Sequence, residues 1–148
     1  MVNYEIFNEI LLKKITFLSI FIGILIITEI IGVIIGAFSK FDKKYFLVIF
    51  IFFIITILII IFAIGPYLLD INENSYIEYS GEFNVDQIYY AKGGGMRTII
   101  TFPDNNNIQF DLNTSQELSE GSHNGVIIYS KHSHVIFEWY DNVNSINE

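Results

Sequence analysis

The stretch "ITFLSIFIGILIITEIIGVIIGAF" occupies residues 15–38 and holds a single ionisable side chain, that of Glu29. A second stretch, "YFLVIFIFFIITILIIIFAIGPYLL", occupies residues 45–69. About 20 helical residues cross a hydrocarbon core of about 30 Å. Isoleucine favours strands in soluble proteins, but a lone strand inside lipid leaves its backbone unpaired. The sequence therefore predicts two transmembrane helices that form a hairpin.

Neither buried core helices nor a cleaved signal peptide fits these stretches as well. Buried core helices would need a soluble partner much larger than the remaining 79 residues. A cleaved signal peptide has an apolar region of about 7 to 15 residues and a small-residue cleavage site. Residues 15–38 exceed that length and lack a convincing site. Both stretches are therefore expected to be retained as spans of the lipid bilayer.

These spans divide the chain into segments of different character. The first fourteen residues place apolar side chains at helical spacing, which is typical of an amphipathic segment that extends a helix or lies along the interface. The predicted order is an amphipathic N-terminal segment (1–14), a first span (15–38), a basic loop (39–44), a second span (45–69), a linker (70–75), an acidic β-domain (76–141) and a tail (142–148).

Lysines near the ends of the spans predict the orientation. The short loop carries Lys40, Lys43 and Lys44, whereas the other side of the first span carries Lys13 and Lys14. Loops rich in lysine and arginine remain in the cytoplasm. We therefore expect a multi-pass protein of the cell membrane with both termini outside the cytoplasm.

One stripe of the first span is suited to helix packing. Thr28, Gly32 and Gly36 are four residues apart, and the two glycines form a GxxxG pattern that permits close approach. Glu29 lies at the edge of this stripe, and an ionisable group at that depth normally faces protein or water. Thr56 lies at a similar depth in the second span, so we expect it to be within reach of Glu29.

Three interpretations of Glu29 remain open at this point. It can be a protonated carboxyl bonded to Thr56 or to a backbone carbonyl. It can contact another membrane subunit, or a second copy of the chain in a homo-oligomer built on the first helix. It can also relay protons or ions, which would make the chain a transporter or a proton-coupled component. Relays usually need several ionisable groups, so the sequence favours packing.

Residues 76–141 change to the two-residue period of strands. The expected strands are 76–80, 82–91, 97–102, 107–112, 125–130 and 134–139. "KGGGM" (92–96), "PDNNN" (103–107) and "SKHS" (130–133) predict tight connections, and "TSQELSEG" (114–121) predicts a helical turn capped by Ser115. This pattern predicts a small antiparallel barrel or sandwich of the SH3-like or OB-like kind, with a curved meander as the alternative. The side chains expected to face inward are Ile77, Phe83, Ile99, Phe110, Ile127 and Ile136.

Charge and composition exclude some functions of this domain. From Asp70 onward the chain has three basic residues and twelve acids. That balance argues against binding nucleic acid or an anionic lipid surface, because both need basic patches. The chain has no cysteine, so disulfides and thiolate metal sites are absent.

The motifs that could carry chemistry are incomplete. "SKHSH" (130–134) combines serine, lysine and histidine, but no third orienting residue accompanies them. His132 and His134 are two residues apart, and no further ligand completes a metal site. The glycines of "KGGGM" are not followed by the GK[ST] of a phosphate loop. We therefore expect a non-enzymatic protein without catalytic residues, a metal site or a cofactor.

Tyrosine and tryptophan are more numerous in the β-domain than so small a core can bury. Exposed aromatic side chains beside acids suit recognition of a protein partner, although contact with lipid headgroups is an equal alternative. The candidate partner-binding residues are Tyr79, Tyr90, Trp139 and Tyr140.

Two stretches carry a resemblance to known proteins, "GPYLLDINENSYIEYSGEF" (65–83) and "GVIIYSKHSHVIFEW" (125–139). The chain resembles small membrane proteins of AT-rich Gram-positive bacteria in which a helical hairpin precedes a short C-terminal β-domain. Some proteins of that build protect their host against its own toxins or bacteriocins. The resemblance implies an immunity-type protein and conveys no functional residues. The expected function is presentation of the β-domain to a membrane or secreted protein, in self-immunity or as an accessory subunit of a membrane complex.

Overall fold

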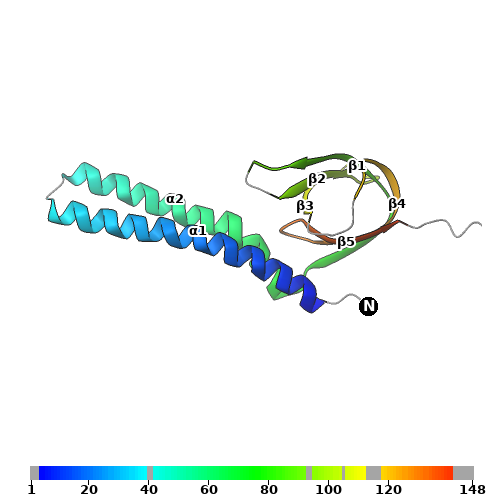
Figure 1. Cartoon of the computed structure of the whole chain (residues 1–148), viewed down its shortest axis with the longest axis horizontal. Coiled ribbons are helices and arrows are strands. Elements are labelled where there is room, and N and C mark those ends of the chain that lie inside the picture. Colours follow the sequence, from blue (N-terminus) through cyan, green and yellow to red (C-terminus); the bar gives the residue numbers. More distant parts are fainter. Residues whose placement is uncertain (1–3, 40–41, 93–94, 105, 113–117, 142–148) are drawn as a thin grey trace, which may run out of the picture. The chain divides into compact units, whose positions relative to one another are not determined.

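The computed structural model describes residues 4–39, 42–92, 95–104, 106–112 and 118–141. The chain divides into two compact units, Met1–Ile71 and Asn72–Glu148. Two long helices precede a small β-sheet along the chain, and Figure 1 shows both parts. A pair of apolar helices followed by a small β-domain is therefore confirmed, and each unit is described by itself.

The helices are α1 (Tyr4–Phe38) and α2 (Lys43–Glu73). Both are long and apolar enough to cross a membrane, judged by length and composition. The N-terminal segment and the first span form one continuous helix, and α2 continues through Pro66 into most of the expected linker. Asp42 precedes α2, and its Oδ1 accepts hydrogen bonds from the amides of Lys44 (2.9 Å) and Tyr45 (3.2 Å), as a helix N-cap does.

The second unit contains five strands rather than the six expected from the sequence. They are β1 (Tyr76–Tyr90), β2 (Met96–Thr101), β3 (Asn107–Leu112), β4 (Gly121–Ser130) and β5 (Val135–Asp141). The division of residues 76–91 into two strands was wrong, because Gly81 does not break β1. Its φ of 152° is open to glycine, so the strand continues through it.

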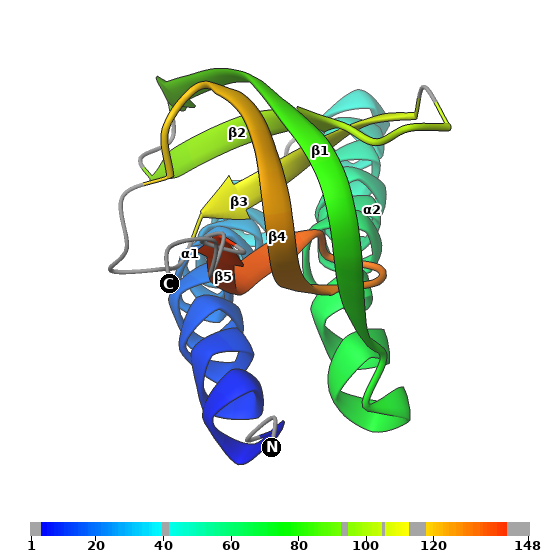
Figure 2. The same ribbon diagram turned by 90° about the vertical axis from the view of Figure 1, so that its right-hand side faces the viewer.

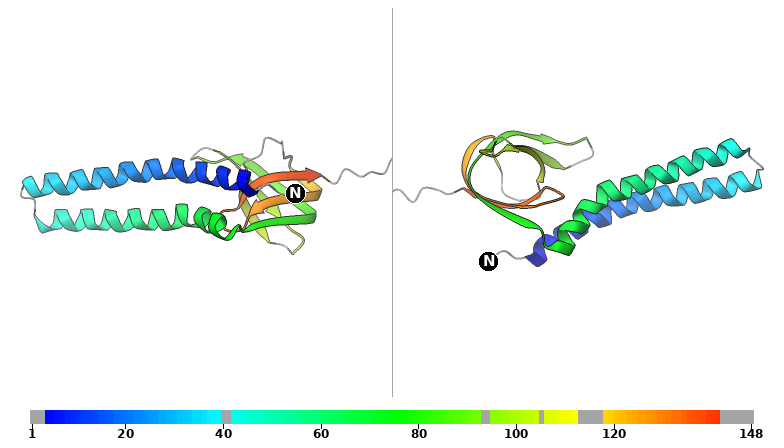
Figure 3. Two further views of the ribbon diagram at one scale, coloured as in Figure 1. Left: turned by 90° about the horizontal axis from the view of Figure 1, so that it is seen from below. Right: turned by 180° about the vertical axis from the view of Figure 1, so that it is seen from behind.

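Each strand pairs with two neighbours in the order β1-β2-β3-β5-β4, and β4 pairs again with β1. Figure 3 shows this ring of strands in its right-hand view. All pairs are antiparallel except β3 with β5. The prediction of a purely antiparallel sheet was therefore wrong. Alternating directions cannot close a ring with an odd number of strands, so at least one parallel pair is required.

The core lies inside this ring and is rich in aromatic residues. Its buried members are Phe83, Val85, Ile100, Phe102, Phe110, Leu118, Ile127, Tyr129 and Ile136, with Ile77 partly buried against them. The prediction that Ile99 faces inward was wrong, because its neighbour Ile100 takes that place. Both positions are apolar, so the two-residue period alone allows either Ile99 or Ile100 to face the core. The structure places Ile100 in the core, and the pairing of β1 with β2 contains a register shift between Val85 and Gln87.

The connections between consecutive strands were largely predictable. "KGGGM", "PDNNN" and "SKHS" each lie between strands that pair as antiparallel neighbours. Ser115, the expected helix cap, lies outside the described residues, and residues 118–121 at the end of that segment are not helical.

Candidate functional site

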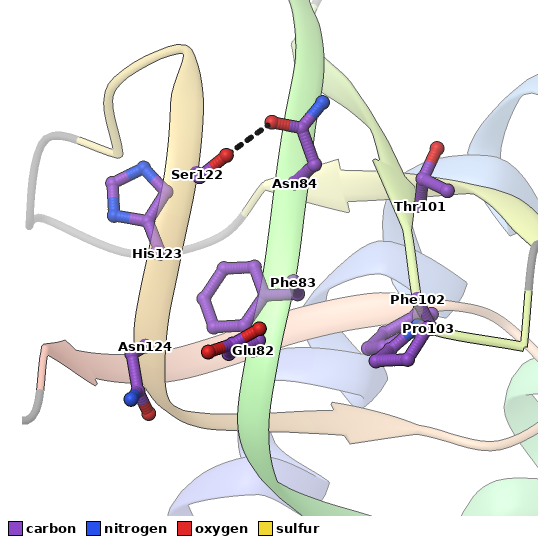
Figure 4. A pocket seen from close by; sticks show the side chains of 9 residues that line it. All are labelled: Glu82, Phe83, Asn84, Thr101, Phe102, Pro103, Ser122, His123 and Asn124. Carbon is purple, nitrogen blue, oxygen red and sulfur yellow. Dashed lines mark hydrogen bonds between the residues drawn. The ribbon is translucent and has the colours of Figure 1, made fainter.

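A pocket of about 500 Å³ opens where β1, the end of β2 and β4 meet. Figure 4 shows the side chains that line it, with Phe83 between the His123 side and the Phe102 side. These residues are Glu82, Phe83, Asn84, Thr101, Phe102, Pro103, Ser122, His123 and Asn124. One wall is tied across strands, because Ser122 Oγ donates a hydrogen bond to Asn84 Oδ1 (3.2 Å).

The end of β2 creates one side of this pocket. Thr101 is the last residue of β2, and it pairs with Asn84 of β1. The amide of Phe102 then donates to the carbonyl of Asn106 (3.3 Å) inside the β2–β3 connection. Pro103 follows and has no amide hydrogen with which to extend the ladder. The chain therefore turns away from β1 at this point.

His123 forms the opposite wall, where its ring stacks on Phe83 with centroids 5.5 Å apart and 19° between the planes. Its Nδ1 lies 3.1 Å from Asp141 Oδ1, and its Nε2 lies 2.8 Å from the carbonyl oxygen of Ser119. Both ring nitrogens thus face oxygen atoms of the protein. These contacts and the stacking on Phe83 hold His123 in place as a wall of the pocket.

A second pocket, of about 360 Å³, shares Phe102 and Pro103 with the first. Its lining residues are Tyr79, Phe102, Pro103, Asp104, Asn106, Ile108 and Tyr129. We call the two pockets together the Phe102 groove. The rings of Tyr79 and Phe102 meet edge to face at 4.7 Å, so aromatic surface forms the floor shared by both pockets.

The polar groups that line the groove are two tyrosine hydroxyls and two carboxylates, among others. Tyr79 donates its hydroxyl to the carbonyl oxygen of Glu82 (2.8 Å). Burial raises the pKa of Tyr129, and the nearby Asp104 carboxylate raises it further, so the phenol stays neutral at physiological pH. As far as the described residues show, the lining includes the carboxylates of Glu82 and Asp104 and neither lysine nor arginine. The groove is therefore acidic at its rim and aromatic at its floor.

The four residues expected to bind a partner lie in different places. Tyr79 lines the groove, whereas Tyr90 is 80% exposed at the end of β1. Trp139 packs against the core, and its Nε1 is buried without a hydrogen-bond partner among the residues that the structure describes. Tyr140 is exposed and donates its hydroxyl to Glu138, a bond that raises the pKa of Tyr140. Only Tyr79 belongs to the groove.

The remaining groove residues were not predicted from the sequence. Pro103 was interpreted only as the start of a turn, and Phe102 only as the end of a strand. His123 carried no motif, because its partners Ser119 and Asp141 are defined by strand register and not by spacing. An apolar residue followed by proline at a strand end was the available signal.

In the helical unit, Thr56 Oγ1 donates a hydrogen bond to Glu29 Oε1 (2.6 Å). Glu29 Oε2 is buried and has no hydrogen-bond partner among the described residues. Thr28 is exposed, and its hydroxyl bonds to the carbonyl oxygen of Ile24 (2.8 Å) in its own helix. The structure therefore brings Glu29 and Thr56 together and leaves Thr28 outside that contact.

The two glycines of the stripe make room for an aromatic ring of α2. Tyr45 donates its hydroxyl to the carbonyl oxygen of Gly32 (3.0 Å). A β-carbon at Gly36 would lie 2.3 Å from Tyr45 Cε1, and one at Gly32 would lie 3.5 Å from Ile49 Cδ1. The GxxxG pattern thus accommodates a side chain of the same chain.

The "SKHSH" turn is occupied by structural hydrogen bonds. Ser130 Oγ and Ser133 Oγ are 2.7 Å apart, and the amide of Val135 donates to Ser130 Oγ (2.8 Å). His132 Nε2 lies 3.2 Å from Glu73 Oε2. Within the described ranges, no three histidine or acidic side chains group in a way that could hold a metal ion.

Glu73 makes stability depend on pH. Hydrogen bonds from Ser75 and, secondarily, His132 lower the pKa of Glu73 below its ordinary value of 4.5. A lowered pKa means that the stabilisation is fully present above about pH 4.5 and is lost as the pH falls through the lowered value. We expect the unfolding midpoint of the wild type to fall more steeply below pH 4.5 than that of Glu73→Gln. Parallel pH profiles for the two proteins would contradict this assignment.

No protein-family model, no curated protein and no solved structure matches the chain.

Proposed function

We propose that the chain is a non-enzymatic integral membrane protein that binds an extended, basic segment of a partner protein in the Phe102 groove. The observation that carries the proposal is the pairing of an aromatic floor with an acidic rim in two pockets that share Phe102 and Pro103. Burying apolar side chains against the aromatic floor is favourable, and the carboxylates at the rim attract basic side chains.

The charge of the whole second unit points to the same partner chemistry. From Asn72 onward the chain has three basic residues and eleven acids. Such an excess attracts basic segments during diffusional encounter and repels acidic ones. The partner segment is therefore rich in lysine or arginine.

The proposed location follows from the helices and from the lysines beside them. Two helices are long and apolar enough to anchor the protein in a bilayer. Lys43 and Lys44, with Lys40, favour a cytoplasmic loop, which would place both termini and the β-domain outside the cytoplasm. The closed order of the five strands supports a small barrel of the SH3-like or OB-like kind.

An anchored binding site at the outer face fits two physiological settings. A self-immunity protein must capture a secreted toxin or bacteriocin of its own host. An accessory subunit must hold a membrane or secreted protein beside a larger complex. In both settings the partner is a protein, and the chain itself performs no reaction.

The proposal predicts that affinity for basic peptides depends on the two rim carboxylates. Peptides would be selected from a random library against the full chain in nanodiscs. For the selected basic peptides, Glu82→Gln and Asp104→Asn should each raise Kd several-fold at low salt, because each variant removes one attractive charge. Glu138→Gln makes the same change of charge outside the lining of the groove and should leave Kd within about twofold. Selection of no basic peptide, or equal losses in all three variants, would refute the proposal.

A further inference from the structure

One edge of β1 carries no strand along half of its length. β1 pairs with β4 over residues 76–85 and with β2 over residues 84–90. On the β2 side, residues 77–83 therefore have no strand partner within the described part of the chain. Figure 2 shows β1 continuing past the strand β2 toward its own first residue.

The sequence at the end of β2 explains this open edge. Asn84 pairs with Thr101 and Val85 with Ile100, so the residue that would lie opposite Glu82 is Pro103. Proline cannot donate to a ladder, and a proline at a strand end stops pairing there. The open edge lies beside the Phe102 groove, because Glu82 and Tyr79 line its two pockets.

The register shows which backbone groups point to the open edge. The amide of Lys131 donates to the carbonyl oxygen of Ser75 (2.9 Å), and these two residues continue the β1–β4 register. Hydrogen-bonded and non-hydrogen-bonded pairs alternate in an antiparallel ladder. The amides and carbonyls of Glu78, Ser80 and Glu82 therefore point away from β4. The Glu82 carbonyl oxygen already accepts a hydrogen bond from the hydroxyl of Tyr79.

We infer that the open edge of β1 binds the partner segment as an added β-strand, and that this segment alternates basic and apolar residues. The inference rests on the proposed function and specifies its binding mode. Main-chain hydrogen bonds to Glu78 and Ser80 would supply affinity without sequence preference, as in other strand additions. Side chains on the two faces of the added strand would supply the preference.

The alternation follows from the two faces of β1. Glu78, Ser80 and Glu82 have exposed side chains, whereas Tyr79 lines the groove and Phe83 is buried. Side chains opposite one another in a sheet lie on the same face. Partner residues opposite the two glutamates therefore meet carboxylates and should be basic. Partner residues between them face the aromatic floor and should be apolar.

Gly81 leaves room on the inner face of β1 for the side chain of Tyr79, which lies over it. A β-carbon there would lie 3.1 Å from the Tyr79 hydroxyl, and the backbone at φ 152° is one that other residues rarely adopt. Position 81 thus has no side chain between Tyr79 and Phe83 on the inner face of β1.

A second copy of the chain is a poorer occupant of the edge. Two β1 edges paired with each other would bring Glu78 and Glu82 against the same carboxylates of the other copy. Like charges opposite one another destabilise a strand pair, and charged edge residues are a common protection against self-pairing. The edge is therefore suited to a basic partner.

The test uses the full chain in nanodiscs and a synthetic peptide of about seven residues that alternates lysine and isoleucine, with blocked ends. Ser80→Pro removes one amide at the open edge without removing a bond to β4, and edge strands tolerate proline. Ser80→Ala keeps the amide and is the matched control. We expect Ser80→Pro to weaken binding about tenfold or more and Ser80→Ala to change it less than about twofold.

A peptide-side measurement keeps the inference testable if Ser80→Pro fails to fold. Every second backbone nitrogen of an added strand faces β1, and the others face away from it. Methylating the nitrogens that face β1 should abolish binding, whereas methylating the others should leave it unchanged. Equal effects of the two methylation patterns, with the Glu82→Gln loss retained, would overturn strand addition and leave the proposed function standing. No binding of any basic peptide would overturn both. A dimer of the full chain that Ser80→Pro converts to a monomer would assign the edge to a second copy and overturn the basic partner.

Discussion

Gly125→Ala is expected to unfold the β-sheet unit at temperatures where the wild type is folded. A β-carbon at Gly125 would lie 2.1 Å from the carbonyl oxygen of Tyr140 and 3.0 Å from Asp141 Cα. Both contacts are with backbone, so relief requires β4 and β5 to separate where they pair. Overpacking that moves backbone costs about 3 kcal/mol or more, a large share of the stability of a small domain.

The single tryptophan of the chain reports this loss directly. Trp139 lies on β5, with its ring centroid 5.4 Å from that of His123 on β4, so its fluorescence follows separation of the two strands. Asn124→Ala changes an exposed side chain next to Gly125 and should leave the unfolding midpoint almost unchanged. A midpoint for Gly125→Ala equal to that of Asn124→Ala would show that the strands are not packed this closely.

Gly36→Ala is expected to have the largest effect in the helical unit. Its β-carbon would lie 2.3 Å from Tyr45 Cε1 and 2.8 Å from Cδ1, so the ring must leave its place between the helices. The move would also break the hydrogen bond from Tyr45 to the Gly32 carbonyl. Small residues at contacts between membrane helices allow such close packing, and their enlargement here should cost about 1–3 kcal/mol.

Energy transfer between dyes on α1 and α2 would measure the effect, since the chain has no cysteine to compete with introduced labelling sites. Gly23→Ala is the matched control, because a β-carbon at Gly23 meets no atom within 4 Å. Removing the ring as well, in Gly36→Ala with Tyr45→Ala, should abolish the clash. Equal loss of helix pairing in Gly23→Ala and Gly36→Ala would contradict the close packing of Tyr45 on Gly36.

The helices could be predicted from sequence because an uninterrupted apolar run of this length satisfies its backbone hydrogen bonds in lipid only as a helix. The contact between Glu29 and Thr56 could also be predicted, because the distance of each residue from the loop follows from the helical rise per residue. The role of Tyr45 was not predicted. A GxxxG pattern shows that something approaches closely, but it does not distinguish a backbone from a ring.

The sheet was harder to predict because its decisive features depend on register. Ile99 and Ile100 are both apolar, so the period alone cannot choose which faces the core. Gly81 is a turn signal in the sequence but lies inside β1, where glycine permits an unusual φ. The Phe102 groove follows from Pro103 lying opposite Glu82, a juxtaposition defined by the pairing of β1 with β2. His123 likewise acquires its partners only when β4 and β5 are in place.

Amide hydrogen exchange tests the binding of a partner strand most directly. The full chain in nanodiscs would be compared with and without a saturating concentration of the alternating lysine–isoleucine peptide. We predict that exchange at the amides of Glu78 and Ser80 slows by about tenfold or more, because the added strand accepts hydrogen bonds from both. The amide of Tyr79 points toward β4 and should not change. Unchanged exchange at Glu78 and Ser80 in the presence of bound peptide would contradict the added strand.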